Sequence, residues 1–185
     1  KKGINITVSI NLSPSQLYDS GLPRLLSDLL QQYEIQANMI ELELTEDVVL
    51  SNSLMVKRQL DEIRAMGVKI SMDDFGKGYS NLSFIRDLHL SAIKIDKTFV
   101  MDLEENPVNK AIVEATKLIC DAKNAEVVAE GIETVQQLNI LKDIGILSGQ
   151  GFLFSPAVKF ESFVSLCETG NFKQLLADKV RSAAS

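Results

Sequence analysis

The chain alternates short stretches of strand-like pattern with longer stretches that carry apolar residues at helical spacing. Residues 4–11 (INITVSIN) switch regularly between apolar and polar positions and are rich in β-branched side chains, as expected of a strand. Similar short, apolar segments predict further strands at 39–44, 68–72, 91–95, 125–129 and 150–154. The pattern therefore predicts six strands.

Between these strands the apolar residues recur every three or four positions. Ser13 can cap a helix, Pro14 suits its first position and Gln16 completes a capping box, and the apolar residues of 22–33 share one face. Similar stripes predict helices at 54–66, 79–88, 107–122 and 134–144, followed by two helices within 160–183. Gly67 and Gly145 stand where two of these helices should end.

Strands that alternate with helices indicate a parallel sheet, because parallel neighbours need crossover connections. An open doubly wound sheet and a (β/α) barrel both fit this pattern. No G-x-G-x-x-G follows any predicted strand, so a dinucleotide-binding site has no support. No linker or low-complexity tract divides the chain, and we expect one domain over residues 1–185.

Polar residues stand where each apolar strand ends. In parallel α/β folds the carboxyl ends of the strands carry the active site, so these residues should converge in one mouth. Successive clusters lie 20 to 36 residues apart, about one β/α unit each. The clusters are Asn11, Glu43, Asp73 with Asp74, Lys94 with Asp96, Glu130, and Gln150.

So many carboxylates predict a site for hard cations. They cannot all stay ionised together without positive charge, and oxygen ligands suit Mg²⁺ or Mn²⁺. The adjacent Asp73 and Asp74 suggest a bridge between two metals, an arrangement that suits phosphodiester hydrolysis. Any one acidic residue at a strand end is more often a helix cap or a solvated residue. The argument depends on the whole set.

Composition narrows the choice of partners. The formal net charge of −6 argues against binding of polymeric nucleic acid. The single histidine, His89, falls in a connecting segment, which excludes a His-based zinc site. Two cysteines are too few for a disulfide framework, and a reducing, cytoplasmic location fits. No apolar run is long enough to span a membrane, so we expect no membrane contact by this domain, although a parent protein could be membrane-anchored.

Taken together, the motifs resemble those of the EAL-domain cyclic di-GMP phosphodiesterases of bacterial signalling. They occur in the family's order and extend to about Pro156. They are Asn11-Leu-Ser-Pro14, Glu43-Leu-Thr-Glu46, Asp73-Asp-Phe-Gly76, Lys94-Ile-Asp96, Ala129-Glu-Gly-Ile-Glu133 and Gln150-Gly151. The resemblance implies a TIM-like (β/α)8 barrel of the EAL type, here incomplete with about six of the eight strands.

The resemblance also implies roles for these residues and two divalent ions, Mg²⁺ or Mn²⁺. Asn11, Glu43 and Asp73 resemble ligands of the first metal, and Asp74 resembles a ligand of the second that helps to set up the attacking water. Lys94 looks like the residue that orients that water or a phosphate oxygen, and Glu130 looks like a metal-binding carboxylate and base. The supporting positions are Asp96, Gln150 and Gly151 near the substrate, and Glu46 and Glu133, which in the family hold the loop Phe75–Asn81 with its Gly76.

The implied activity is hydrolysis of cyclic di-GMP to linear pGpG by the parent domain, as a homodimer with an upstream sensory or GGDEF-type domain. The alternatives are a catalytically inactive cyclic di-GMP receptor and a scaffold without ligand. The Glu-Ala-Leu motif itself is absent, and in the family it lies upstream of Asn11 and supplies a metal ligand. We therefore expect this chain to be the C-terminal portion of the domain and inactive alone. Lys77 stands where the family usually has Thr, and we expect it to be solvated.

Overall fold

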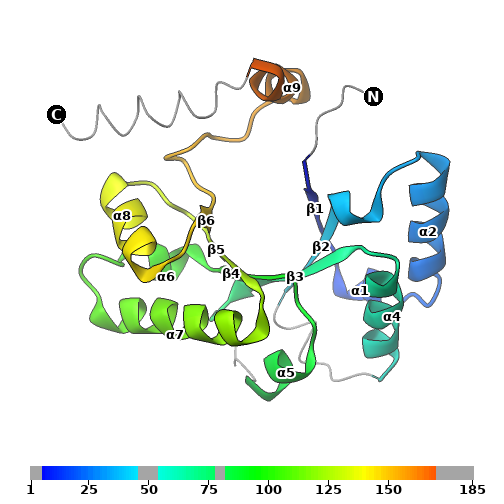
Figure 1. The fold of residues 1–185 in the computed structure, drawn as a ribbon, viewed down its shortest axis with the longest axis horizontal. Helices are drawn as coiled ribbons and strands as arrows, with labels where there is room; N and C mark the ends of the chain where they lie inside the picture. The colour runs from blue at the N-terminus through cyan, green and yellow to red at the C-terminus, as the bar shows by residue number, and fades with distance from the viewer. Residues whose placement is uncertain (1–5, 46–53, 78–81, 170–185) are drawn as a thin grey trace. The chain divides into compact units, whose positions relative to one another are not determined.

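A computed structural model describes residues 6–45, 54–77 and 82–169 (Figure 1). Six strands form one sheet in which the strands follow each other in chain order, and the β1–β2, β2–β3 and β5–β6 pairs are parallel. The strands are β1 (Val8–Asn11), β2 (Ile40–Thr45), β3 (Lys69–Phe75), β4 (Ala92–Ile95), β5 (Glu126–Ala129) and β6 (Ser148–Gly149). A doubly wound sheet reverses its strand order at a switch point, whereas chain order throughout is the order of a (β/α) barrel.

Helices connect successive strands, as parallel pairing requires. They are α1 (Pro14–Leu17), α2 (Leu22–Gln32), α4 (Leu54–Ala65), α5 (Leu82–Asp87), α6 (Lys97–Met101), α7 (Pro107–Lys123), α8 (Val135–Ile144) and α9 (Phe160–Thr169), with the 3₁₀ turn η1 (Ala37–Met39) before β2. The chain forms two compact units. The N-terminal unit comprises Asn5–Lys94 and Lys123–Glu126, and the C-terminal unit comprises Ile95–Ala122 and the residues from Val127 onward.

In the N-terminal unit, strand β2 separates an apolar face of the sheet from a polar one. Its residues Ile40, Leu42 and Leu44 are buried, and they alternate with Glu41 and Glu43. Helix α4 contributes the buried side chains Val56, Leu60 and Ile63, which lie on one helical face. Burial of these aliphatic side chains stabilises the fold by roughly 1.5–3 kcal/mol each. The strand alternation leaves the opposite face to the polar side chains.

In the C-terminal unit, α7 and α8 bury one face each. Cys120 of α7 is fully buried, as expected for a structural thiol. Helix α8 begins with a capping box, in which Thr134 accepts a hydrogen bond from the backbone of Gln137, and ends at the predicted Gly145 with a left-handed φ of 90°. The predicted limits of this helix are therefore confirmed.

Two predicted elements differ from the structure. The last strand is Ser148–Gly149, so the predicted strand at 150–154 is wrong. There the chain turns: the N–H of Phe154 donates to the carbonyl of Gly151, and the N–H of Leu153 donates to the carbonyl of Ile132. The second difference lies at 13–33, where two helices replace one because the Asp19 side chain accepts a hydrogen bond from the N–H of Gly21 and α2 begins only at Leu22.

The apolar stripe of α2 is only partly covered by the described residues. Leu22, Leu26 and Leu30 are half-buried, whereas Leu25 and Tyr33 are 56% and 61% exposed. The first part of the helix predicted at 79–88 and the second helix predicted within 160–183 lie outside the described residues.

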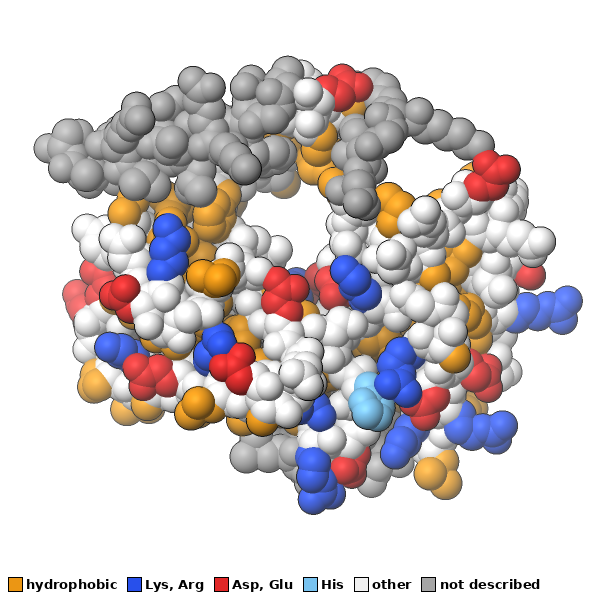
Figure 2. All heavy atoms as spheres, in the orientation of Figure 1, with side chains coloured by type: hydrophobic (Ala, Val, Ile, Leu, Met, Phe, Trp, Pro, Cys, Tyr) orange, Lys and Arg blue, Asp and Glu red, His pale blue; other side chains and the backbone are white. Residues whose placement is uncertain are grey.

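Charges are mixed on the face drawn in Figure 2. Acidic and basic side chains lie interspersed there, and no broad basic patch forms on this face. Within the part of the chain that the structure describes, every helix is too short or too polar to cross a bilayer.

Candidate metal centre

Strand register places the first polar side chains on one face of the sheet. Asn11 pairs with Glu43, and Glu43 pairs with Ser71 on the next strand. Registered neighbours point to the same face, and so does Asp73, two positions after Ser71. The polar alternation of β1–β3 therefore aligns Asn11, Glu43 and Asp73 on one face of the sheet.

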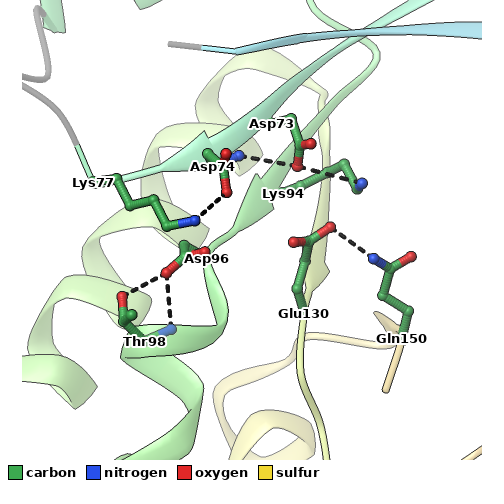
Figure 3. A network of polar contacts seen from close by, with 8 residues as sticks. All are labelled: Asp73, Asp74, Lys77, Lys94, Asp96, Thr98, Glu130 and Gln150. Atoms are coloured by element: carbon green, nitrogen blue, oxygen red, sulfur yellow. Dashed lines mark hydrogen bonds and ion pairs between the residues drawn. The ribbon is translucent and has the colours of Figure 1, made fainter. Parts of the chain in front are cut away.

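Lys94 bridges two of these carboxylates. Its Nζ lies 2.9 Å from Glu43 Oε1 and 3.4 Å from Asp73 Oδ1 (Figure 3 draws the second contact). The side chains of Lys94 and Glu43 are each 8% exposed, and that of Asp73 is 16% exposed. A buried ammonium thus offsets charge that would otherwise be costly to bury at this face.

Asp74 has an unusual backbone conformation with a φ of 56°. Asp is one of the few residues that enter this left-handed region, at a cost of about 1–2 kcal/mol. In a regular strand, adjacent side chains point to opposite faces, and the left-handed turn interrupts that alternation. The N–H of Asp74 also donates to Asp73 Oδ1 at 2.9 Å. Strain of this kind collects at functional sites, where the surrounding structure holds it.

Lys77 forms an ion pair with Asp74. Its Nζ lies 2.6 Å from Asp74 Oδ1, and the two side chains are 46% and 38% exposed (Figure 3). The turn between them is fixed by Gly76, which has a φ of 99°, and by a hydrogen bond from the N–H of Lys77 to the carbonyl of Asp74. The expectation that Lys77 is simply solvated is therefore wrong, because the turn folds its ammonium back onto the preceding carboxylate.

In the C-terminal unit, Gln150 holds the carboxylate of Glu130. Gln150 Nε2 donates to Glu130 Oε1 at 2.8 Å (Figure 3). The backbone supports this pair, because the N–H of Glu130 donates to the carbonyl of Ile95 and the N–H of Gln150 donates to the carbonyl of Ala129. Glu130 therefore follows the end of β5, and Gln150 follows the end of the neighbouring β6.

Two glycines keep this pair in place. Gly131 has a φ of 70°, and a β-carbon there would lie 2.4 Å from Cβ of Lys97. A β-carbon on Gly151 would lie 2.1 Å from the carbonyl oxygen of Ile132. Only glycine fits either position, because such distances are far below van der Waals contact. The sequence predicted a role for Gly151 but missed that of Gly131, and the two close approaches are visible only in three dimensions.

Asp96 is almost fully buried and caps helix α6. Its Oδ1 accepts hydrogen bonds from the N–H of Thr98 at 2.9 Å and from Thr98 Oγ1 at 2.6 Å (Figure 3). This is the cap that a lone acidic residue at a strand end most often provides. A contact of Asp96 with substrate or metal stays a prediction.

The structure leaves the residues that are predicted to hold the loop Phe75–Asn81 largely untested. Glu46 lies outside the described residues, as do 78–81 of the loop that Glu46 and Glu133 should hold. Glu133 is exposed, and its backbone N–H donates to Gln137 Oε1. Phe75 is buried beside the strand end. The loop-holding role of these residues therefore stays a prediction.

The donor set of the N-terminal unit fits a hard divalent cation. It offers carboxylate and amide oxygens, the ligands that Mg²⁺ and Mn²⁺ prefer, and His89 is exposed away from the strand ends. Ser71, which the sequence analysis missed, lies on the same face, and its buried Oγ has no hydrogen-bond partner among the described residues. A buried hydroxyl of this kind is rare in proteins and suits a face that binds a polar group.

Comparisons with known proteins find relatives of this chain in sequence and in fold. Cyclic di-GMP phosphodiesterase PdeR of Escherichia coli (strain K12) is 37% identical over 163 residues, which are 86% of this chain and 25% of PdeR. The crystal structure of the EAL domain of Mycobacterium smegmatis DcpA matches with a TM-score of 0.87 and 33% identity, over 91% of this chain and 75% of that one. The manganese and cyclic di-GMP complex of Klebsiella pneumoniae BlrP1 matches with a TM-score of 0.78 and 33% identity, over 82% and 39%.

The chain spans about a quarter of the length of the curated relatives it matches. Its strand order and these structural matches confirm the predicted fold class, six consecutive parallel strands of a TIM-like barrel. A model of the EAL domain family matches residues 1–157. The chain belongs to the EAL domain family.

Proposed function

We propose that the protein containing this chain hydrolyses cyclic di-GMP to linear pGpG with Mg²⁺ or Mn²⁺. Relatives named as cyclic di-GMP phosphodiesterases, PdeR of Escherichia coli and NbdA of Pseudomonas aeruginosa, support the reaction. Complexes of BlrP1 with cyclic di-GMP and either calcium or manganese support the use of divalent ions. The observation that carries the proposal is the set of oxygen donors at successive strand ends.

The proposed metal ligands stand at strand ends. Asp73 and Asp74 lie near the end of β3 and Glu130 follows β5, and the proposal assigns all three carboxylates to the metal ions. Asn11 and Glu43 would complete the first coordination sphere on the polar face of the sheet. When bound, the ions would activate a water molecule and neutralise charge on the phosphoryl oxygens.

The chain's own residues have three tasks in this proposal. Lys94 holds Glu43 and Asp73 in place and offers its ammonium to a phosphate oxygen or to the attacking water. Glu130, oriented by Gln150, takes the proton that water loses as it attacks phosphorus. The bond from phosphorus to the 3′ oxygen breaks, and that oxygen takes up a proton from solvent. The product is the linear dinucleotide.

The test is turnover of cyclic di-GMP by the full-length protein with Mg²⁺ or Mn²⁺, followed by separation of pGpG. Production of pGpG that stops when the metal is chelated supports the proposal. Tight binding of cyclic di-GMP in Ca²⁺ without turnover in Mg²⁺ or Mn²⁺ would instead identify a receptor, and absence of both binding and turnover would leave a scaffold.

A homodimer and an upstream sensory or GGDEF-type domain belong to the same proposal. Sedimentation of the full-length protein tests whether it is a homodimer.

A further inference from the structure

The contact between Lys77 and Asp74 has a consequence for metal binding. Asp74 is the residue proposed to hold the second metal, and its Oδ1 already has an ammonium 2.6 Å away. A side-chain nitrogen at this distance occupies a position from which a cation would approach that oxygen. The Lys77 ammonium is therefore a positive charge that the protein itself supplies at this carboxylate.

The backbone conformation of residues 74–77 favours this contact. Asp74 and Gly76 both have positive φ values, and the N–H of Lys77 donates to the carbonyl of Asp74. This tight turn brings residue 77 back over residue 74. The pair is not needed for stability, because partly exposed ion pairs contribute little to folding. The ion pair instead affects how strongly the Asp74 carboxylate binds another cation.

The balance of charge at the strand ends also indicates that Lys77 affects metal binding at Asp74. In the N-terminal unit, Glu43, Asp73 and Asp74 contribute three carboxylates, and Lys94 and Lys77 offset two of those charges. Lys94 is buried against Glu43 and Asp73, and Lys77 contacts Asp74. A neutral residue at 77 would leave Asp74 more strongly attractive to a divalent ion.

We propose that Lys77 competes with the divalent ion for Asp74 and so raises the metal concentration that the second site needs. The inference rests on the proposed function, because it takes Asp74 to be a metal ligand. A divalent ion must displace the ammonium from Oδ1 or bind beside it against charge repulsion. Lys77 thereby sets how readily the site fills, without itself contacting the substrate.

The test measures Mn²⁺ binding to the full-length protein by calorimetry and by the loss of the free Mn²⁺ signal in electron paramagnetic resonance. Lys77→Met removes the charge and keeps the length of the side chain. Lys77→Arg keeps the charge, and Lys110→Met makes the same change in net charge on an exposed position of α7. Circular dichroism confirms that each variant is folded before titration.

We expect Lys77→Met to bind the weaker Mn²⁺ about three- to tenfold more tightly, the size of effect that a partly screened charge pair supports. Lys77→Arg and Lys110→Met should match the unchanged protein. Equal Mn²⁺ affinity in Lys77→Met and the unchanged protein overturns the inference while leaving the proposed function intact. Absence of Mn²⁺ binding in every form overturns the proposed function, and the inference with it.

Discussion

Lys94→Met tests the charge balance on which the site depends. The substitution keeps the length of the side chain and removes an ammonium that lies 2.9 Å from Glu43 Oε1 and 3.4 Å from Asp73 Oδ1. Each contact corresponds to about 5–6 kcal/mol of attraction at an effective dielectric constant of about 20. Desolvation of the ammonium offsets several kcal/mol of that attraction in the unchanged protein.

The net loss should be about 3–5 kcal/mol, because the substitution leaves buried carboxylates without their partner. Urea denaturation of the metal-free protein measures it as a lower midpoint with an unchanged slope. Saturating Mn²⁺ should recover part of the lost stability, since a bound cation replaces the missing charge. Lys110→Met, on an exposed position of α7, serves as the control and should change the stability by less than about 0.5 kcal/mol.

Two results would refute this reasoning. A loss below about 1 kcal/mol would mean that Glu43 and Asp73 do not depend on the ammonium, as for an exposed pair. A loss of the expected size that Mn²⁺ leaves unchanged would mean that the metal does not bind these carboxylates.

Three further predictions concern single contacts. Gln150→Leu should lower turnover about 10- to 100-fold with little change in the melting temperature, because Glu130 loses the donor that orients it; wild-type turnover would contradict this role. Gly131→Ala should lower stability by more than about 1 kcal/mol, because its φ is 70° and its β-carbon would lie 2.4 Å from Cβ of Lys97; an unchanged thermal midpoint would be inconsistent with this packing. The Arg86 guanidinium lowers the pKa of the exposed Asp87, so the ion pair stabilises the folded state above the ordinary aspartate pKa of 3.8 and loses that effect as the pH falls through the lowered value. Arg86→Gln should therefore melt slightly below the unchanged protein at neutral pH and together with it in acid, and a difference that persists in acid would exclude this origin.

The order of the elements was predictable because each depends on local pattern. The capping boxes at Ser13 and Thr134 and the glycine at 145 are short-range signals, and the structure contains all three. The choice between a doubly wound sheet and a barrel was not predictable in the same way. Both have the same alternation along the chain, and they differ only in which distant strands pair.

The errors in the predicted elements also arise from contacts between residues that are distant in the sequence. The apolar run Phe152-Leu153-Phe154 resembles a strand, but the backbone at Leu153 donates to the carbonyl of Ile132 and turns away. The apolar stripe of α2 predicted the helix correctly but not its burial, since Leu25 stays 56% exposed among the described residues. Periodicity indicates which residues share a face, whereas burial of that face depends on residues far along the chain.

The site was predictable in its residue types more than in its contacts. Strand ends and family motifs predict the site residues, and the register places Asn11 beside Glu43. The pairing of Lys77 with Asp74 depends on two left-handed residues in a turn, and no local pattern in the sequence announces it. The unpartnered hydroxyl of Ser71 was missed because serine in a strand carries no special signal.

The central claim is that oxygen donors at successive strand ends hold divalent ions for phosphodiester hydrolysis. Its most direct test is conversion of cyclic di-GMP by the full-length protein in Mn²⁺, compared with the Asp74→Asn variant, which keeps the shape of the side chain and removes its charge. The account predicts pGpG from the unchanged protein, none after chelation and a large loss in the variant. Cyclic di-GMP that binds tightly yet stays intact in saturating Mn²⁺, or equal turnover in the variant, would contradict it.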